Sequence, residues 1–386
     1  MQANRIALYS HDTLGFGHFR RNLMLAKKLR ALPSKPDVML VAGTYEVGAF
    51  DIPDGIEVLT LPAYAKHADG QYTARRLNME LCELRALREA ILAATLKRFA
   101  PDLLIVDNVP LGAQGELEGP LRKLRKRGKT RLVLGCRDIL DDPATVRRQW
   151  LRQRHVETIN TYFDAVWIYG DPAVYDVFKD CDLTGITAEI VHTGYLLKDW
   201  PAEVAPSGGE APLVLCTVGG GRDGLDLCKA FAAAELPAGH RGIIVPGTQM
   251  DADALARIRQ IAAGNRGMQV VPFVPDLVPL MAAARRIVAM GGYNTTCEIL
   301  ALKKPALIVP RVAPRTEQLI RARALSDRGL VDICHPRGLS PTALSEWMAR
   351  PIPRAASHGI RTDGLASVAA LAQSALYPDY QQIAAE

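Results

Sequence analysis

The sequence has few of the features that mark secreted, membrane-spanning or metal-binding proteins. Its 386 residues include seven cysteines, and no two of them have CxxC spacing. An odd and scattered set of cysteines indicates neither a disulfide framework nor a zinc site. No apolar run approaches the ~20 residues needed to cross a bilayer. His11 and Asp12 also end the first apolar run too early for a signal peptide. We therefore expect a cytoplasmic protein.

Aromatic residues are scarce, at 6% of the chain, and the net charge is a modest +6. The basic residues are unevenly placed: residues 121–131 (LRKLRKRGKTR) contain many of them and no acidic residue. No aromatic residue is interleaved with these bases, so nucleic-acid binding is not indicated. The segment is either a solvated helix face or a surface attracted to an anionic membrane. The second interpretation would hold the protein at the inner face of the membrane.

Short apolar runs alternate with amphipathic segments along most of the chain, including one long helical pattern at 143–161. This alternation predicts parallel sheets covered by helices on both faces. It is interrupted at residues 200–212, which are rich in Pro, Gly, Ser and Ala and have the character of an interdomain linker. We expect two Rossmann-like, doubly wound domains, 1–199 and 213–386, with a last helix at about 363–377 packing back on the first domain. Ligands of such sheets bind at the carboxyl ends of the strands, so the site is expected in the cleft between the domains.

The first loop with residues suited to catalysis is 10–22, SHDTLGFGHFRRN. Gly15 and Gly17 permit a tight turn after the first predicted strand, and His18 stands at the start of the next helix. Histidine titrates near neutral pH and is the usual general base for a hydroxyl nucleophile, although a capping or packing histidine is the alternative. The chain lacks a full GxGxxG motif followed by an acid, so a nicotinamide dinucleotide site is not indicated.

Two further loops have main-chain groups suited to a nucleotide. In residues 218–224 (VGGGRDG), Gly220 and Gly221 expose backbone N–H groups before a helix and Arg222 adds charge, an arrangement that suits phosphate oxygens. The alternative is a plain glycine-rich turn. The loop around Phe273 could read the edge of a base, but its sequence signals a turn more clearly than a site.

The fourth loop, around Gly292, follows an apolar strand and opens a predicted helix. Asn294 or Thr295 could cap that helix, and Thr295 and Thr296 offer hydroxyl and N–H groups to a phosphate. Glu298 lies one turn into the helix. A carboxylate there is favoured by the helix dipole and can accept hydrogen bonds from the two vicinal hydroxyls of a ribose.

Five more residues complete the set of candidates. Glu317 and Gln318 begin another predicted helix and could hold sugar hydroxyls, although both are also ordinary first-turn residues. Asp107, Arg137 and Asp138 follow strands of the first domain. We expect them on the acceptor side of the cleft, with Arg137 and Asp138 also placed to reach a donor phosphate.

Residues 273–311 resemble the donor domain of the family 28 glycosyltransferases, and residues 12–29 resemble the N-terminal glycine-rich loop of that family. The resemblance implies a GT-B fold with His18 as the base. It also implies that the loops and carboxylates named above bind a nucleoside-diphosphate sugar, which we expect to be uridine-linked. Three departures stand out. Met290 replaces the histidine of a related plant signature, no proline follows His18, and the family's Gln-Gln pair is Glu317-Gln318 here.

The resemblance implies an inverting, metal-independent transferase that moves a hexose or N-acetylhexosamine to a hydroxyl of a glycan, a lipid-linked molecule or a secondary metabolite. No cofactor and no metal are expected, since the DxD matches at 180–182 and 251–253 do not fall at predicted strand ends. Two alternatives remain open: a UDP-sugar epimerase of the same fold, and a catalytically silent sugar-nucleotide-binding partner of another subunit.

Overall fold

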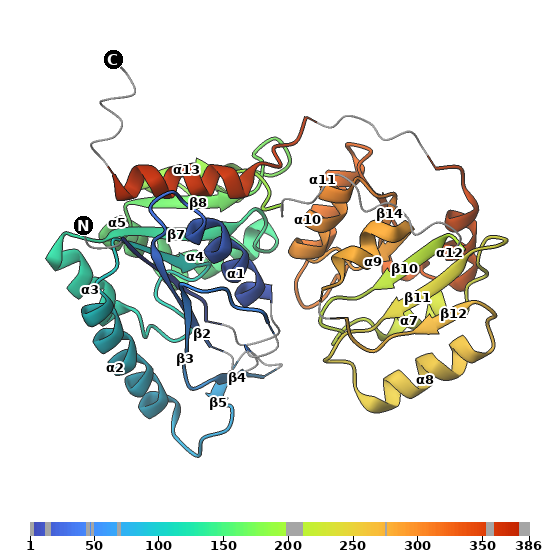
Figure 1. Ribbon diagram of the computed structural model, residues 1–386, viewed down its shortest axis with the longest axis horizontal. Helices are drawn as coiled ribbons and strands as arrows, with labels where there is room; N and C mark the ends of the chain where they lie inside the picture. The colour runs from blue at the N-terminus through green and yellow to red at the C-terminus, as the bar shows by residue number, and fades with distance from the viewer. Residues whose placement is uncertain are drawn as a thin grey trace.

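Two parallel β-sheets lie side by side, each covered by helices (Figure 1). Residues 200–210 of the predicted linker and Gly15 of the first loop fall outside the described residues. The computed structural model describes residues 4–11, 17–43, 47, 50–67, 71–197, 211–274, 276–352 and 359–377.

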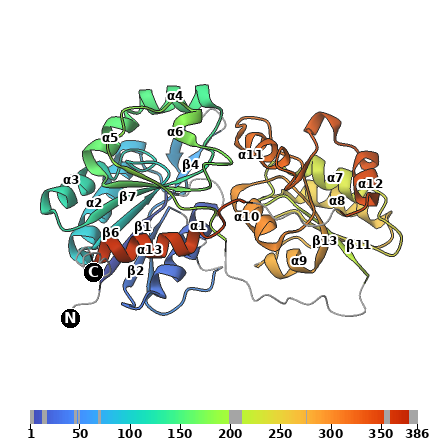
Figure 2. The ribbon, with the colours of Figure 1, turned by 90° about the horizontal axis from the view of Figure 1, so that it is seen from above.

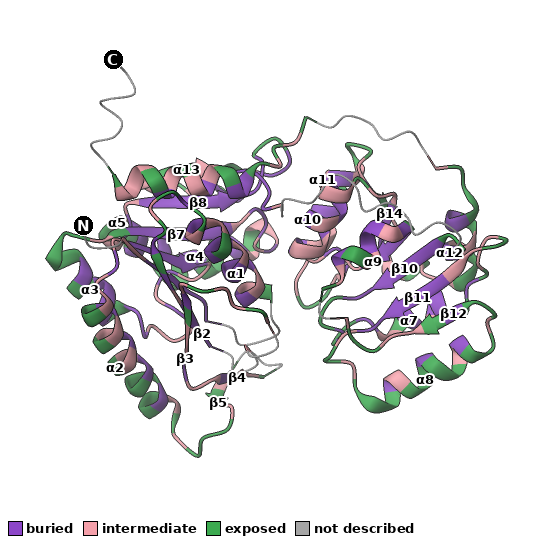
Figure 3. Cartoon of the chain, in the orientation of Figure 1, coloured by how far each residue is buried: buried purple, intermediate pink, exposed green. Residues whose placement is uncertain are grey.

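The first sheet has seven strands in the order β3-β2-β1-β6-β7-β8-β9, and every neighbouring pair is parallel. The central strands are buried along their whole length because helices cover both faces, which explains their continuous apolar sequences (Figure 3). The direction of winding reverses between β1 and β6, which is the topological switch point of the sheet. The strands are β1 (Arg5–Tyr9), β2 (Asp37–Ala42), β3 (Ile56–Thr60), β6 (Leu103–Asp107), β7 (Arg131–Arg137), β8 (Ala165–Tyr169) and β9 (Glu189–His192).

The second sheet has six parallel strands in the order β12-β11-β10-β13-β14-β15, with its switch point between β10 and β13. The predicted pair of doubly wound parallel sheets is therefore confirmed. The strands are β10 (Leu213–Thr217), β11 (Arg241–Val245), β12 (Met268–Val270), β13 (Ala284–Ala289), β14 (Ala306–Ile308) and β15 (Asp332–Ile333).

The helices pack on both faces of each sheet and turn their polar sides outward (Figure 3). In the first sheet's domain they are α1 (Gly17–Arg30), α2 (Leu81–Phe99), α3 (Glu118–Arg127), α4 (Pro143–Arg152), α5 (His155–Tyr162) and α6 (Val177–Asp180). In the second they are α7 (Leu225–Ala232), α8 (Ala252–Ala263), α9 (Val278–Ala283), α10 (Tyr293–Leu302), α11 (Glu317–Ser326) and α12 (Pro341–Ala349), with a 3₁₀ turn at Pro336–Gly338. None of the helices in the described ranges combines the length and the apolar character needed to span a bilayer.

The last described helix, α13 (Gly364–Leu376), returns to the first domain and lies along α1 (Figure 2). Its apolar side, with Leu365 and Val368, joins the core formed by α1 and the first sheet. Gly364 permits this approach, because a Cβ atom there would come within 2.4 Å of the carbonyl oxygen of Gly194. The first domain is thus completed by the far end of the chain.

Local sequence patterns missed two features of this architecture. The single helix predicted at 143–161 is divided into α4 and α5, because Arg154 takes a left-handed conformation with φ 52° and ends the first helical run. A small antiparallel hairpin, β4 (Tyr64–Lys66) and β5 (Tyr72–Ala74), projects beside the first sheet. Its Tyr64 is buried beneath the guanidinium of Arg88, 4.3 Å from the ring centroid.

Candidate functional site

The switch points of the two sheets lie against each other across the domain interface. In the first domain, the loop after β1 leads into α1 and β6 ends at Asp107. In the second, the loops after β10 and β13 lead into α7 and α10. Asn294, in the first turn of α10, donates a hydrogen bond from Nδ2 to the carbonyl oxygen of Gly17 at 3.2 Å. The starts of α1 and α10 are therefore in direct contact.

His18 is held by two residues of its own domain. It lies in the first turn of α1 with 19% of its side chain exposed, and its Nδ1 contacts the carboxylate of Asp107. Arg21, one turn further along α1, pairs with the other carboxylate oxygen through Nε at 3.2 Å. A carboxylate can only accept, so its contact favours the Nδ1–H form of His18, with Nε2 as the basic nitrogen. Nη2 of Arg21 also lies 2.9 Å from Nδ1.

The charge state of this cluster is fixed by its surroundings. Burial by itself would raise the pKa of Asp107, but the positive charge of Arg21 and the hydrogen bonds from Arg21 and His18 hold that pKa well below its usual range. The predicted acceptor contact of Asp107 is therefore corrected, since its buried carboxylate orients His18 and Arg21. His11 lies beside His18, with ring centroids 4.8 Å apart. Burial and the charge of His18 lower the pKa of His11 to about 3, so it stays neutral at physiological pH.

The loop at 218–224 follows β10 at the carboxyl edge of the second sheet, next to the switch point. Gly221 has φ 97°, and a Cβ atom there would approach the carbonyl oxygen of Pro246 to 2.1 Å, so only glycine fits. Gly220 and Arg222 are exposed. The exposed N–H groups and the arginine remain available to an anionic ligand.

The loop after β13 opens α10 differently from the sequence prediction. Gly292 is the N-cap and no side chain caps the helix, so the prediction of a cap at Asn294 or Thr295 is wrong. Thr296 is buried and donates its N–H to the carbonyl oxygen of Gly292 at 2.9 Å. It therefore offers neither its hydroxyl nor its N–H to a ligand. The first-turn N–H groups without an intrahelical acceptor are those of Tyr293, Asn294 and Thr295.

Glu298 lies one turn further along α10 and is partly buried. Its Oε1 accepts from the guanidinium of Arg20, on α1 of the other domain, at 3.0 Å. The carboxylate expected to hold a ribose is thus paired with a cation that an incoming nucleotide would have to replace.

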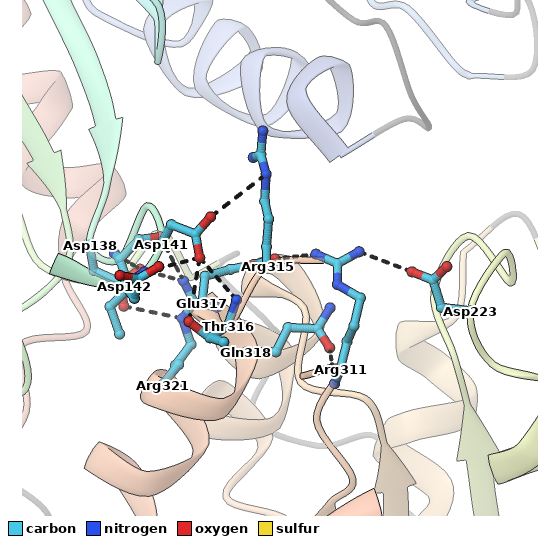
Figure 4. Close-up of polar contacts among 11 residues, drawn as sticks. Asp138, Asp141, Asp142, Asp223, Arg311, Arg315, Thr316, Glu317, Gln318 and Arg321 are labelled. Atoms are coloured by element: carbon cyan, nitrogen blue, oxygen red, sulfur yellow. Dashed lines mark hydrogen bonds and ion pairs between the residues drawn. The ribbon is translucent and has the colours of Figure 1, made fainter. Parts of the chain in front are cut away.

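Glu317 and Gln318 are tied to the glycine-rich loop through one arginine (Figure 4). The guanidinium of Arg311 pairs with Oε1 of Glu317. The main-chain N–H of Arg311 donates to Oε1 of Gln318 at 2.9 Å. The same guanidinium reaches Asp223, within residues 218–224, at 3.0 Å. Glu317 is buried, and its Oε2 has no partner among the described residues. This oxygen is a free acceptor beside the glycine-rich loop.

The sequence predicted that Asp138 faces a ligand, and this prediction is wrong. Asp138 instead joins the two domains. Its carboxylate is fully buried and receives Nη2 and Nε of Arg321 at 2.7 and 3.2 Å and the hydroxyl of Tyr195 at 2.9 Å. Asp141 lies nearby and accepts the N–H of Thr316 at 3.0 Å, so a carboxylate of the first domain caps α11 of the second (Figure 4).

Two predicted residues stand apart from these networks. Arg137 ends β7 and is partly buried, and its Nε is enclosed without a partner among the described residues. Phe273 is 46% exposed in the loop after β12, the edge strand of the second sheet. Its ring is free to stack on a flat ligand, and β11 separates its strand from β10 and the loop that follows it.

Most of the residues that organise this site were missed by sequence reasoning. Arg21 had a local signal, because it stands three residues after His18 and so shares its helical face. The others have partners far away in the chain and had no such signal. They are Arg20, Tyr195, Arg311, Asp141 and Arg321.

Two doubly wound domains whose switch points face each other across a polar interface define the GT-B class of proteins. Residues 243–350, the larger part of the second domain, match the C-terminal domain of glycosyltransferase family 28.

Several curated relatives of the chain carry the name UDP-N-acetylglucosamine–N-acetylmuramyl-(pentapeptide) pyrophosphoryl-undecaprenol N-acetylglucosamine transferase. The protein of that name from Methylobacterium nodulans is 34% identical over 134 residues, which is 32% of this chain and 35% of the relative. The one from Yersinia pseudotuberculosis serotype O:1b is 24% identical over 90% of both chains. The more identical alignments cover only about a third to a half of each relative's length.

Solved structures share the fold across nearly the whole chain. The calicheamicin glycosyltransferase CalG4 superposes with a TM-score of 0.59 at 16% identity, covering 100% of this chain and 98% of its own. A putative UDP-N-acetylglucosamine 2-epimerase from Listeria monocytogenes superposes with a TM-score of 0.62 at 13% identity, covering 99% and 98%. At such identities the likeness concerns the fold, which transferases and an epimerase share.

Proposed function

We propose that this protein is an inverting glycosyltransferase that moves a hexose or N-acetylhexosamine from a UDP-sugar to an acceptor hydroxyl. The supporting observation is the contact between the start of α1, which carries His18, and the start of α10, where Asn294 donates to Gly17. A base oriented by a buried carboxylate thus lies next to a helix N-terminus suited to a phosphate. The family match and the names of the relatives favour the same activity.

In the proposed reaction, Nε2 of His18 takes the proton of the acceptor hydroxyl while its oxygen attacks the anomeric carbon. One displacement from the opposite side inverts the configuration at that carbon. Asp107 stabilises the imidazolium that forms. Negative charge grows on the departing diphosphate, and the N–H groups of Gly220, Gly221 and the first turn of α10 stabilise it.

We propose that this stabilisation needs no metal ion. The two DxD matches support this, because one carboxylate of each match serves a local role in a helix. Asp251 caps α8 by accepting the N–H of Ala254 at 2.7 Å. Asp180 ends α6 and accepts the N–H of Asp176 at 2.9 Å. The test is whether magnesium changes the affinity for UDP or the rate of transfer.

Glu298→Gln is expected to weaken UDP binding by about ten- to a hundredfold. A hydrogen bond to a carboxylate contributes roughly 1.5–3 kcal/mol, and the amide keeps the size of the side chain but not its charge. Isothermal titration calorimetry with UDP, TDP and GDP, with and without magnesium, measures the effect and the base preference. UDP binding without magnesium is the expected result for the unaltered protein.

Two variants make this experiment specific. Glu346→Gln, an exposed glutamate on α12, should bind UDP as the unaltered protein does. Arg20→Ala removes the cation paired with Glu298 and should leave UDP affinity unchanged or raise it. Failure of a folded sample to bind any of the three nucleotides would sink the transferase proposal.

The superposition on the putative epimerase keeps one rival open. An epimerase converts the nucleotide sugar without any acceptor, whereas the proposed transferase releases UDP only as the sugar passes to an acceptor hydroxyl, or to water in its place. Incubation with UDP-N-acetylglucosamine alone, followed by nuclear magnetic resonance of the sugar, separates the two. A second epimer with no release of UDP would favour the rival.

The basic segment at 121–131 lies away from the cleft. It spans most of α3 and leads into β7, so it lies at the amino edge of the first sheet, whereas His18 lies at the carboxyl edge (Figure 1). We propose that it makes a separate contact with anionic lipid, which would leave the cleft facing away from the membrane.

Changing Arg122, Lys123, Lys126 and Lys129 together to glutamine should abolish sedimentation with vesicles of equal parts phosphatidylserine and phosphatidylcholine. Each exposed base contributes about 1 kcal/mol near such a surface. Arg147→Gln with Arg148→Gln on α4 is the matched control. Unchanged sedimentation of the fourfold variant would exclude this segment as the contact.

A further inference from the structure

Arg137 differs from the other arginines around the candidate site. Arg21 holds Asp107, Arg311 holds Glu317, and Arg321 holds Asp138. The side chain of Arg137 makes no hydrogen bond and no ion pair with any residue in the described part of the chain, and its Nε is fully enclosed. An enclosed donor without an acceptor is uncommon in folded proteins and calls for a physical explanation.

The surroundings of Arg137 are positively charged. Burial and the charges of Arg21 and Arg321 lower its pKa to about 10, and among the carboxylates Glu317 opposes this effect. The charge of Glu317 is already shared with Arg311. Arg137 therefore remains a cation at neutral pH with no carboxylate of its own. An unpaired buried charge lowers the stability of the ligand-free protein, so binding of an anion beside it is favourable.

The main chain of Arg137 belongs to the first domain, whereas the charges around its side chain come from both domains: Arg21 from the first, and Arg321, Glu317 and Arg315 from the second. Arg137 ends β7, the strand beside β6, which ends at Asp107 behind His18. It thus ends one strand away from Asp107, the residue that contacts His18. The loops suited to the donor diphosphate, at 218–224 and after β13, belong to the second domain.

We propose that Arg137 binds an oxyanion of the acceptor, a phosphate or a group of phosphate-like shape and charge, and so positions the acceptor hydroxyl before His18. The guanidinium fork suits two oxygens of such a group. This inference rests on the proposed function, which supplies the acceptor. It narrows the acceptor class to molecules that carry an oxyanion near the hydroxyl that receives the sugar.

Inorganic pyrophosphate is the probe, and the full chain is titrated with it by calorimetry in the presence of saturating UDP. We expect the unaltered protein to bind pyrophosphate in addition to UDP. Arg137→Met should weaken pyrophosphate binding by about tenfold or more, and Arg137→Lys should weaken it less, because it keeps the charge but loses the fork. UDP affinity should change by less than about threefold in both variants.

The melting temperature separates a binding role from a structural one. Removal of an unpaired buried charge should leave the ligand-free Arg137→Met variant as stable as the unaltered protein, or more stable. Arg323→Met, an exposed arginine of α11, is the matched control and should change neither binding nor stability.

Three results would overturn the proposal. They are pyrophosphate binding that Arg137→Met leaves unchanged, absence of pyrophosphate binding by the unaltered protein, and loss of UDP affinity in Arg137→Met. The last would assign the arginine to the donor. A protein that binds no UDP fails as a transferase, but titration with pyrophosphate alone still reports on Arg137.

Discussion

His18→Ala is expected to lower the rate of sugar transfer by about a hundred- to ten-thousandfold, which is the usual contribution of a general base. Its affinity for UDP should stay within about threefold, since the groups proposed to hold the nucleotide belong to the second domain. The rate is measured as UDP released from a UDP-sugar, with an acceptor present or with water in its place. Calorimetry with UDP gives the affinity.

Asp107→Asn tests how the base is oriented. The amide keeps the size of the side chain, but it no longer fixes the Nδ1–H form of His18 or stabilises the imidazolium. We expect a smaller loss of rate than for His18→Ala. Arg21 loses its carboxylate in this variant, so the melting temperature is measured beside the rate.

His240→Ala, in the second domain, is the control and should react as the unaltered protein does. A His18→Ala variant with full activity would remove the proposed base. Equal losses of rate and UDP affinity would instead assign His18 to nucleotide binding.

Arg321→Met is expected to destabilise the closed arrangement of the two domains by about 3–5 kcal/mol, the usual cost of breaking a buried ion pair from one side. Asp138 would keep only the Tyr195 hydroxyl and a main-chain N–H as partners. Arg321 also stacks on Tyr293, 5.5 Å from the ring centroid, and that ring donates its hydroxyl to the carbonyl oxygen of Tyr169. The loss therefore affects an interface that joins both domains.

If the domains separate, water can solvate the Asp138 carboxylate again. Part of the loss of stability should therefore appear as separation of the two domains. We expect a lower melting temperature and a larger radius of gyration in small-angle X-ray scattering. Arg321→Met combined with Asp138→Asn should recover much of the stability, because no charge is left unpaired. Arg323→Met on the same helix should resemble the unaltered protein. A fully stable and compact Arg321→Met variant would show that the pair does not hold the domains together.

The sheets and the candidate loops could be predicted because their signals are local. A continuous apolar run such as Leu103–Asp107 fits only a strand covered on both faces, and the glycines at 218–224 mark a turn by their own backbone freedom. Since each such run is followed by a helical pattern, parallel order and ligand loops at the carboxyl ends follow as well. α12 carries local signals as well, since Ser340 caps it and Pro341 stands in its first turn.

The pairing of charges could not be predicted. Asp107 and Asp138 have the same appearance in the sequence, each an acid at the end of an apolar strand. One orients His18 from within its own domain, and the other binds Arg321, which lies 183 residues away in the second domain. Glu298 is separated from Arg20 by 278 residues. No local pattern carries information over such distances.

The sequence by itself determined the two doubly wound domains, the position of His18 at the first switch point and the loops that open toward a nucleotide, because these depend on periodicity and on the backbone preferences of nearby residues. Only the tertiary structure decided which acid contacts His18, which acid joins the domains and which buried arginine side chain lacks a partner among the described residues. The physical reason is that an ion pair is selected by distance in space and by exclusion of water, and both arise only after the strands and helices have packed.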